Sequence, residues 1–315
     1  MPNVTLPADD GVRKNELLQW WYWTGHLESS DGRKFGFEIV FFLADVLANV
    51  AWGQMAQCAV SDFGANRFAK RQDVWPWGPR MPANAFDLAT PLGEITAIGG
   101  DGEDSLHAAV DGYVLDLTSR ALRPPTLHYG GGDHRYSFGG DTYYYSRPVL
   151  GLEGNLTLPT GGVLSVRGQG WFDRQFGELI PAVLVGWQWF AIQLAGNVQV
   201  MIFSFNKQPA ELYGSITKAD GSVVELGPSD ITIEITAWWT SPSSGIKYPH
   251  GWTVTIPGQT LTITPEMDDQ EMAGGFWLGP RYWEGACEVT GSTVGKAYVE
   301  LVGFAYYHYE QPLAP

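Results

Sequence analysis

Asp173 is the residue of this sequence best suited to acid chemistry. It follows Trp171 by two positions in GWFDRQFG (170–177), so on a strand the carboxylate and the indole share one face. A carboxyl group protonates a carbon–carbon double bond only if burial or a neighbouring carboxylate keeps it neutral. Arg174 comes next and would point to the opposite face, yet a guanidinium folded back towards Asp173 would lower the pKa of that carboxyl. Such a shift would weaken Asp173 as a proton donor.

Neutral hydrogen-bond donors permit a different chemistry, a pericyclic [4+2] closure, which transfers no proton. It needs a pocket that folds the substrate and donors that polarise an activating carbonyl. Tyr143 and Tyr145 would share one strand face and Tyr144 the other. For each tyrosine, a buried hydroxyl bonded to a backbone carbonyl is the structural alternative. The candidate donors are Gln19, Tyr22, Tyr143, Tyr145, Gln188 and Trp189.

Glu284 and two histidines are further candidates. Glu284 would share a strand face with Tyr282 and Glu288. It is a candidate for a second acid, and a water-exposed position at the rim of the cavity is the alternative. His26 and His128 are suited to orienting a substrate oxygen or to acting as a base near neutral pH, and a structural role in the core is the alternative for both.

Aromatic residues are concentrated in five clusters, which is unusual. The clusters favour a lined cavity for a large hydrophobic molecule, although core packing is the alternative for any single cluster. The segments are QWWYWTGHL (19–27), YYYS (143–146), GWFDRQFG (170–177), GWQWF (186–190) and YWEGACEV (282–289). The expected substrate-binding residues are Trp21, Tyr22, Trp23, His128, Trp171, Trp187, Trp189, Tyr282 and Glu284.

Common catalytic and metal-binding motifs are absent from the sequence. It contains no GxSxG, no GxGxxG after a strand, no GxxxxGK[ST] and no HExxH. Its 6 histidines include no pair with the i, i+2 or i+4 spacing of joint metal ligands, and Cys58 and Cys287 lie in no CxxC or Cys/His cluster. We therefore expect no bound metal and two free thiols.

Composition and charge narrow the class of partner. The chain has 315 residues, 44% of them hydrophobic, and a formal net charge of −15. Such a charge repels nucleic acids and anionic membranes, which are therefore unexpected as partners. The aromatic clusters make a large hydrophobic small molecule the expected partner. No stretch reads as a signal peptide or as eighteen consecutive apolar residues, so we expect a soluble cytoplasmic protein without membrane insertion, as a monomer or a dimer.

The hydrophobic pattern predicts an all-β protein with antiparallel strands. Isoleucines alternate with polar residues over 230–239, and similar stretches recur along the chain, separated by turn signals such as Asp31-Gly32, Gly196-Asn197 and Asp220-Gly221. The segment Phe41–Val50 is the best helix candidate. Between residues 62 and 104 the alternation breaks down in a stretch rich in proline and tryptophan, which predicts either a long loop over a cavity or a plain surface excursion.

The length favours two domains. The alternation pauses around residues 178–185, and a linker there would separate two parts of sensible domain size. Aromatic-rich strands recur in both halves without an exact repeat, as tandem barrels or sandwiches would show.

The sequence resembles the carotenoid 1,2-hydratase and AttH-like superfamily, which also includes decalin-forming Diels–Alderases. Its landmarks occur here in family order: QWWYWTGHL, RPPTLHYG, DTYYYS, GWFDRQFG, GWQWFAIQL and YWEGACEVTGSTVGKAYVELVGF. The resemblance runs nearly end to end. It implies two lipocalin-like β-domains, over 1–182 and 183–315, and a cofactor-free protein that holds a polyene, isoprenoid or polyketide within or between them.

Departures from the family pattern bear on the reaction. Family hydratases carry an acid before the first tryptophans and an Asp-His-Glu-like run at the junction, where this sequence has Gln19 and Asp173-Arg174-Gln175. Only Asp173 keeps the acid role, which favours a cofactor-free cyclase that performs an intramolecular [4+2] cycloaddition. The catalytic candidates are then Asp173, Tyr143, Tyr145 and Gln19. The alternatives are a hydratase or proton-initiated cyclase that uses Asp173, and a non-catalytic carrier of a hydrophobic ligand.

Overall fold

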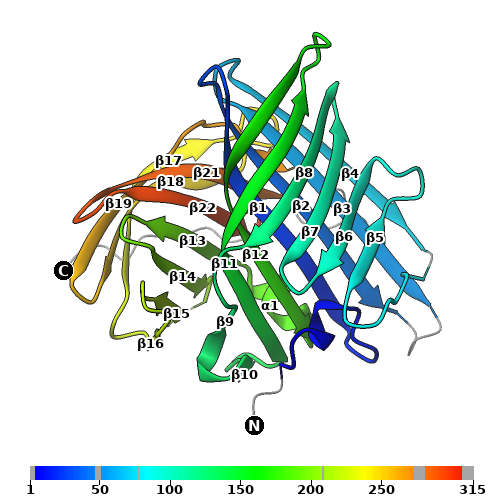
Figure 1. The fold of residues 1–315 in the computed structure, drawn as a ribbon. Helices are drawn as coiled ribbons and strands as arrows, with labels where there is room; N and C mark the ends of the chain where they lie inside the picture. The colour runs from blue at the N-terminus through cyan, green and yellow to red at the C-terminus, as the bar shows by residue number, and fades with distance from the viewer. Residues whose placement is uncertain (1–3, 47–50, 77, 208, 273–280, 307–315) are drawn as a thin grey trace.

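The computed structural model describes residues 4–46, 51–76, 78–207, 209–272 and 281–306 (Figure 1). Nearly all regular structure is β, in two curled antiparallel sheets that each form half a barrel. The helical turns are η1 (Ala8–Asp10), η2 (His128–Gly130) and α1 (Ile180–Val185). This confirms the predicted all-β class and the two lipocalin-like units. None of the helices in these ranges has the length and apolarity to span a membrane.

The first sheet contains the strands that precede α1. Its order is β4-β3-β2-β1-β12-β11-β8-β7-β6-β5, and β9 and β10 pair with β11. The strands are β1 (Leu18–Ser29), β2 (Lys34–Asp45), β3 (Trp52–Asp62), β4 (Arg67–Trp75), β5 (Phe86–Ala89), β6 (Ile95–Gly100), β7 (Glu103–Val110), β8 (Tyr113–Ala121), β9 (Thr126–Leu127), β10 (Asp133–Arg135), β11 (Asp141–Thr157) and β12 (Val163–Gly177).

The second sheet contains the strands that follow α1. Its order is β16-β15-β14-β13-β22-β21-β19-β18-β17, and β20 pairs with β21. The strands are β13 (Trp187–Leu194), β14 (Val198–Phe205), β15 (Glu211–Thr217), β16 (Val223–Leu226), β17 (Thr232–Thr240), β18 (Lys247–Ile256), β19 (Gln259–Pro265), β20 (Glu271–Met272), β21 (Tyr282–Gly291) and β22 (Gly295–Val302). The domain boundary proposed at 182/183 falls inside α1.

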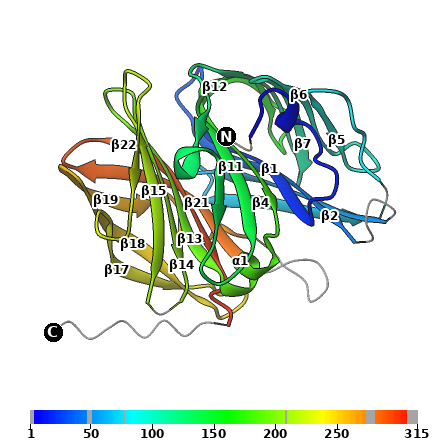
Figure 2. The same cartoon turned by 90° about the horizontal axis from the view of Figure 1, so that it is seen from below.

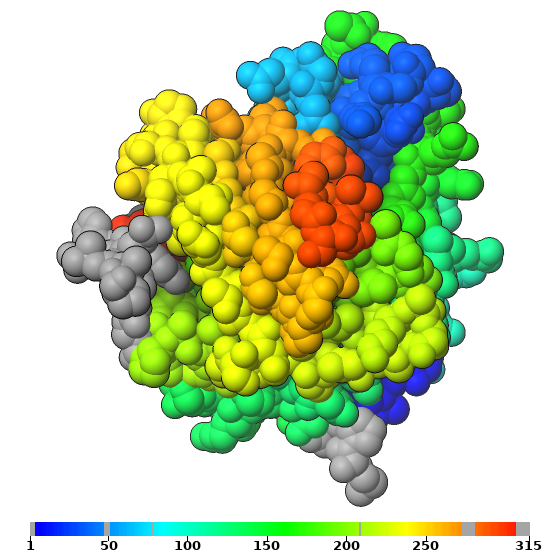
Figure 3. Space-filling view, turned by 90° about the vertical axis from the view of Figure 1, so that its left-hand side faces the viewer, coloured from blue at the N-terminus to red at the C-terminus, as the bar shows by residue number. Residues whose placement is uncertain are grey.

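The two sheets pack face to face where β1 and β12 meet the second sheet. Alternate residues of β1 belong to different cores: Trp21 and Trp23 lie inside the first half-barrel, whereas Trp20 and Tyr22 face the second sheet. Trp187 and Trp189 of β13 share the face that meets them, as the alternation predicted. Seen from below, the two curved sheets lie side by side (Figure 2). Figure 3 shows strands of the second sheet filling one side of the molecule.

Two local predictions are wrong. The proposed helix at Phe41–Val50 is a strand up to Asp45, and residues 47–50 lie outside the described residues. Phe41 and Leu43 point into the first core while Phe42 packs on the interface, so the segment follows a period of two. The stretch 62–104 is not one long loop, because it contains β4, β5 and β6, and its longest connection spans residues 76–85 between β4 and β5. The expected free cysteines are confirmed, because Cys58 and Cys287 are both buried and unbridged.

A buried ion pair holds the N-terminal segment against one end of the first half-barrel. Arg147 on β11 donates to both carboxylate oxygens of Asp10 in η1, at 2.7 and 2.9 Å, and the Tyr145 hydroxyl donates to the same group. Asp10 is fully buried and Arg147 is nearly so. Two charges withdrawn from water are tolerated here because each has its partner in place.

We expect Arg147→Met to lower the free energy of unfolding by about 3–5 kcal/mol, because it leaves the Asp10 carboxylate buried without its cation. Arg120→Met is the matched control, since Arg120 and its partner Glu103 are both largely exposed. The control should change stability by less than about 1 kcal/mol. Urea titrations followed by circular dichroism measure both, and equal effects of the two variants would contradict the role of the buried pair.

Candidate active site

A cavity of about 290 Å³ opens between the two sheets beside α1. Its walls include Leu18 and Trp20 of β1, Phe42 of β2, Val183 of α1 and Val302 of β22. The size is at the lower end of small-molecule pockets, which are roughly 300–1,000 Å³. Its lining is mainly apolar, which suits a hydrophobic ligand.

A smaller chamber of about 30 Å³ adjoins this cavity and shares four of its lining residues, Trp20, Phe42, Trp187 and Glu300. The remaining lining of the chamber is Tyr22, Asp173, Gln175, Trp189 and Phe203. Two carboxyl groups thus face a space about the size of one water molecule, within aromatic walls. We call the cavity and this acid chamber together the candidate active site.

Asp173 is buried and held by three donors. Its Oδ2 accepts the Tyr144 hydroxyl at 2.6 Å, and its Oδ1 accepts the Trp171 indole N–H at 2.7 Å and the Ser146 hydroxyl. Tyr144 in turn accepts the Trp189 indole N–H at 3.1 Å. Burial raises the pKa of Asp173 to about 7, although each of the three donors lowers it. A carboxyl group with this pKa carries its proton about half of the time at neutral pH.

Arg174 does not reach Asp173. It points to the opposite face of β12, where its guanidinium lies 3.9 Å from the centre of the Trp21 ring. Its N–H groups donate to the backbone carbonyls of Asp9 and Gly11 and to the Gln19 side chain at 2.8 Å. The sequence-based objection that Arg174 depresses the pKa of Asp173 therefore does not apply.

Glu300 is the second carboxyl group of the chamber. The Trp187 indole donates to its Oε2 at 2.7 Å. The pKa of Glu300 is raised to about 7, mainly by burial and in smaller part by the nearby Asp173 charge, although the Trp187 hydrogen bond lowers it. Charge on Asp173 therefore disfavours charge on Glu300 beside the same small chamber.

Two more buried acids, Glu284 and Glu38, lie near the chamber without lining it. Glu284 lies directly across from Glu300 in the pairing of β21 with β22, and burial raises its pKa well above the ordinary range. Neither of its carboxylate oxygens has a hydrogen bond of normal geometry among the described residues, although the nearby Tyr22 hydroxyl stabilises its charged form. Glu38 accepts the Tyr282 hydroxyl at 2.7 Å, and burial raises its pKa to about 8.

The structure brings some of the sequence candidates together and separates others. Tyr22, Trp171, Asp173, Trp187, Trp189, Tyr282 and Glu284 gather at the interface between the sheets. Trp21, Trp23 and Tyr145 lie in the core of the first half-barrel, and Tyr143 packs on Phe176 at its edge. Gln19 is bound to Arg174 and to the backbone of Arg13.

His128 is buried at the interface, whereas His26 is half-buried there. His128 hydrogen-bonds to Ser146, which in turn bonds to Asp173, and Nε2 of His26 lies 3.1 Å from Oε1 of Glu266, a pair that is ionic only when the ring is protonated. Burial lowers the pKa of both rings, to about 3 for His128.

Four residues of the site escaped the sequence reasoning: Glu38, Tyr144, Ser146 and Glu300. The two glutamates carried a usable signal, because each is a lone acid inside an apolar strand, FGFEIVFF and AYVELV. A single charge in such a run is costly to bury, so it marks a position with a purpose beyond packing. Tyr144 shares YYYS with the tyrosines that were chosen, but it lies on the other face.

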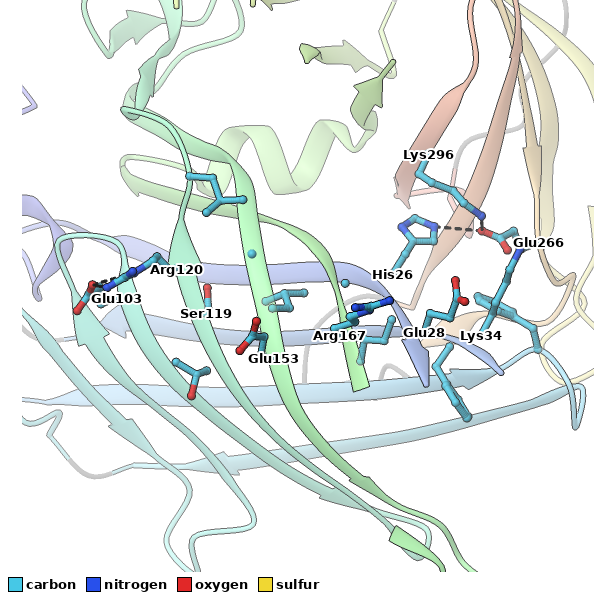
Figure 4. Close-up of a pocket in the computed structure, with 18 residues that line it drawn as sticks. His26, Glu28, Lys34, Glu103, Ser119, Arg120, Glu153, Arg167, Glu266 and Lys296 are labelled. Atoms are coloured by element: carbon cyan, nitrogen blue, oxygen red, sulfur yellow. Dashed lines mark hydrogen bonds and ion pairs between the residues drawn. The ribbon is translucent and has the colours of Figure 1, made fainter. Parts of the chain in front are cut away.

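A separate cavity of about 760 Å³ lies at the far end of the interface and has a different character (Figure 4). Charged residues of opposite sign alternate along it, and Glu28, Arg167 and Glu153 occupy directly paired positions on β1, β12 and β11. On the second sheet, Lys296 donates to Glu266 at 2.7 Å. Pairing between oppositely charged side chains on neighbouring strands is enough to account for the charged lining of this solvated groove.

Comparison with solved structures finds the same two-sheet fold in proteins of low sequence identity. NE1406 of Nitrosomonas europaea, described as an AttH, is 26% identical, with a TM-score of 0.86 over 96% of this chain and 98% of that one. Kievitone hydratase from Nectria haematococca is 17% identical, with a TM-score of 0.76 over 96% and 93%. CghA in complex with Sch210972 is 13% identical, with a TM-score of 0.54 over 92% and 93%.

Sequence comparison gives the family. A search of curated proteins finds no significant match. The model of the family described as AttH-like matches residues 1–304, almost the whole chain. The protein therefore belongs to the AttH-like family.

Proposed function

We propose that the protein is an enzyme that protonates a carbon–carbon double bond of a hydrophobic substrate and adds water to the resulting cation. The observation that carries this proposal is that Asp173 and Glu300 line one chamber at the inner end of an apolar cavity. We propose an alkene-bearing polyketide or isoprenoid as the substrate class, because the lining of the cavity is mainly apolar. Kievitone hydratase, which shares the fold, is compatible with this proposal.

Asp173 supplies the proton in this proposal. Its neutral form is well populated near pH 7 because burial raises its pKa to about 7. After the proton has moved to one alkene carbon, the Tyr144, Ser146 and Trp171 donors stabilise the carboxylate that remains. An acid matched to neutral pH, with its conjugate base stabilised in advance, satisfies the main demands of general-acid catalysis.

Glu300 accepts the second proton. Water adds to the cationic carbon, and a proton leaves that water for the Glu300 carboxylate, so one proton enters the chamber pair and one leaves it in each turnover. The net reaction is addition of H and OH across the double bond. Trp20, Trp187 and Trp189 surround the chamber, and indole faces stabilise positive charge.

The competing function is the [4+2] cycloaddition expected from the sequence. That reaction relies on neutral donors at the ligand. Of the candidate donors, Tyr22 and Trp189 line the chamber, whereas Tyr143, Tyr145 and Gln19 line neither the cavity nor the chamber. Two carboxyl groups with raised pKa line the chamber instead. The geometry therefore supports proton transfer over a pericyclic reaction.

We expect Asp173→Asn to lower turnover of an alkene substrate by at least about 10²-fold, because an amide has no proton to donate. The assay incubates candidate polyenes with the protein in D₂O or ¹⁸O-water and follows the product by mass spectrometry. Asp104→Asn is the matched control, since Asp104 is also a buried acid with a pKa of about 6 but bonds to Trp23 inside the first half-barrel.

Wild-type product should gain one solvent deuterium at carbon and one solvent oxygen. A product of unchanged mass that Asp173→Asn still forms would identify a pericyclic cyclase. A bound molecule recovered unchanged would indicate a carrier.

We expect a bell-shaped dependence of kcat/KM on pH with its maximum near 7. Asp173 acts in its acid form, which is lost as the pH rises past its pKa, whereas Glu300 acts as a carboxylate, which is lost as the pH falls below its pKa. Both pKa values are raised to about 7. Glu300→Gln should remove the acid limb and keep the alkaline limb, while Asp104→Asn keeps both. A flat profile between about pH 5 and pH 9 would contradict the acid–base pair.

A further inference from the structure

A continuous chain of hydrogen bonds leads from the second sheet to Asp173. His128 in η2 lies between two hydroxyl groups: its Nδ1 is 3.0 Å from the Ser215 oxygen on β15, and its Nε2 is 2.6 Å from the Ser146 oxygen on β11. The Ser146 hydroxyl also bonds to Oδ1 of Asp173. All four side chains are buried, at 4% exposure or less. The chain therefore joins both domains to the acid chamber.

The direction of each hydrogen bond follows from the carboxylate. An ionised carboxylate only accepts, so Ser146 must donate to Asp173. The Ser146 oxygen is then free to accept, and Nε2 of His128 must be the protonated ring nitrogen. Nδ1 is left as an acceptor for the Ser215 hydroxyl. His128 stays neutral in this arrangement, in agreement with its pKa of about 3, which burial lowers.

The two oxygens of Asp173 are unequal as a result. Oδ1 accepts two donors, from Ser146 and Trp171, whereas Oδ2 accepts only the Tyr144 hydroxyl. A carboxyl oxygen that already accepts two hydrogen bonds is a poor place for an added proton. The acid proton therefore belongs on Oδ2.

We propose that His128 is a positioning residue: it acts on Asp173 through Ser146, holding that hydroxyl as a donor to Oδ1 and thereby directing the acid proton to Oδ2. This inference rests on the proposed acid role of Asp173 for its catalytic meaning, and the hydrogen-bonded device itself is testable without substrate. His128 needs no contact with substrate in this role, and it lines neither the cavity nor the chamber.

Other titratable groups lie around Asp173, and none of them is changed in the variants that test this role. They are Tyr22 on β1, Tyr144 on β11, Glu284 on β21 and Glu300 on β22. Arg174 points away from Asp173, as described above. The tyrosine rings next to His128 are Tyr144, at 4.2 Å between ring centres, and Tyr129, its chain neighbour.

The test is a carbon-13 NMR titration of the Asp173 carboxyl group, assigned by its loss in Asp173→Asn. Ser146→Ala should move the midpoint upward from about 7 by about one pH unit, because a donor to the charged form is lost. His128→Asn should move it upward by less, since its shorter side chain loses Ser146. His128→Gln should restore the wild-type midpoint, because its amide nitrogen reaches the position of Nε2.

The double variant gives the decisive comparison. In the Ser146→Ala background, His128→Asn should add no further shift, because the effect of His128 passes through Ser146. The proposal would be overturned if His128→Asn shifted the midpoint equally in the presence and in the absence of Ser146. It would also be overturned if His128→Asn caused no shift in the otherwise wild-type protein. Nitrogen-15 spectra should show His128 protonated on Nε2 throughout, and a ring protonated on Nδ1 would also overturn it. His134→Asn is the control histidine variant, with no expected shift.

Activity separates this inference from the proposed function. If Asp173→Asn keeps full turnover while the titration shifts behave as expected, the proposed reaction fails and the positioning of Asp173 by His128 stands. If Asp173→Asn is inactive and His128→Asn leaves the titration unchanged, the acid role stands and this inference fails. Thermal melts identify any variant that has merely lost its fold.

Discussion

The molecule depends on one constraint, the burial of both faces of β1 and its neighbours. Trp21 and Trp23 fill the first half-barrel, while Trp20 and Tyr22 on the same strand fill the interface with the second sheet. Over residues 19–25 this strand has no side exposed to water. Any polar group placed on it must find its partners inside the protein, and any carboxyl group placed there loses the solvation of its charge.

The acids of the candidate site follow from that constraint. Glu38, Asp173, Glu284 and Glu300 come from β2, β12, β21 and β22, and all four face the interface instead of either barrel core. Burial is the main cause of the raised pKa in every case. For three of them, indole and hydroxyl donors offset part of the free-energy cost of burying the carboxyl group. The Glu284 oxygens have no hydrogen bond of normal geometry among the described residues, which shows that the site is not arranged for maximal stability.

The strands and the shared faces within them were predictable from the sequence, because alternation is a local property. Trp187 with Trp189, and Trp171 with Asp173, were paired correctly for this reason. The core into which each strand face packs depends on the rest of the fold and cannot be predicted from the local pattern. Tyr144 is an example. In YYYS the outer two tyrosines and the middle one are equivalent by pattern. Only the register of β11 against β12, in which Ser146 pairs with Asp173, places the middle one beside Asp173. The helix predicted from Phe41 was wrong because leucine and alanine favour helices in isolation, whereas pairing with the neighbouring strands makes Phe41–Asp45 part of β2.

The indoles at the interface also make the molecule its own optical probe. Trp20 of the first sheet and Trp187 of the second stack with 6.4 Å between ring centres, and Trp171 meets Trp189 edge to face at 6.3 Å. Aromatic rings this close share their excited states, so near-ultraviolet circular dichroism contains a contribution that exists only while the sheets are docked. Separation of the two half-barrels, with each fold intact, would erase that contribution and leave the far-ultraviolet spectrum of the strands unchanged.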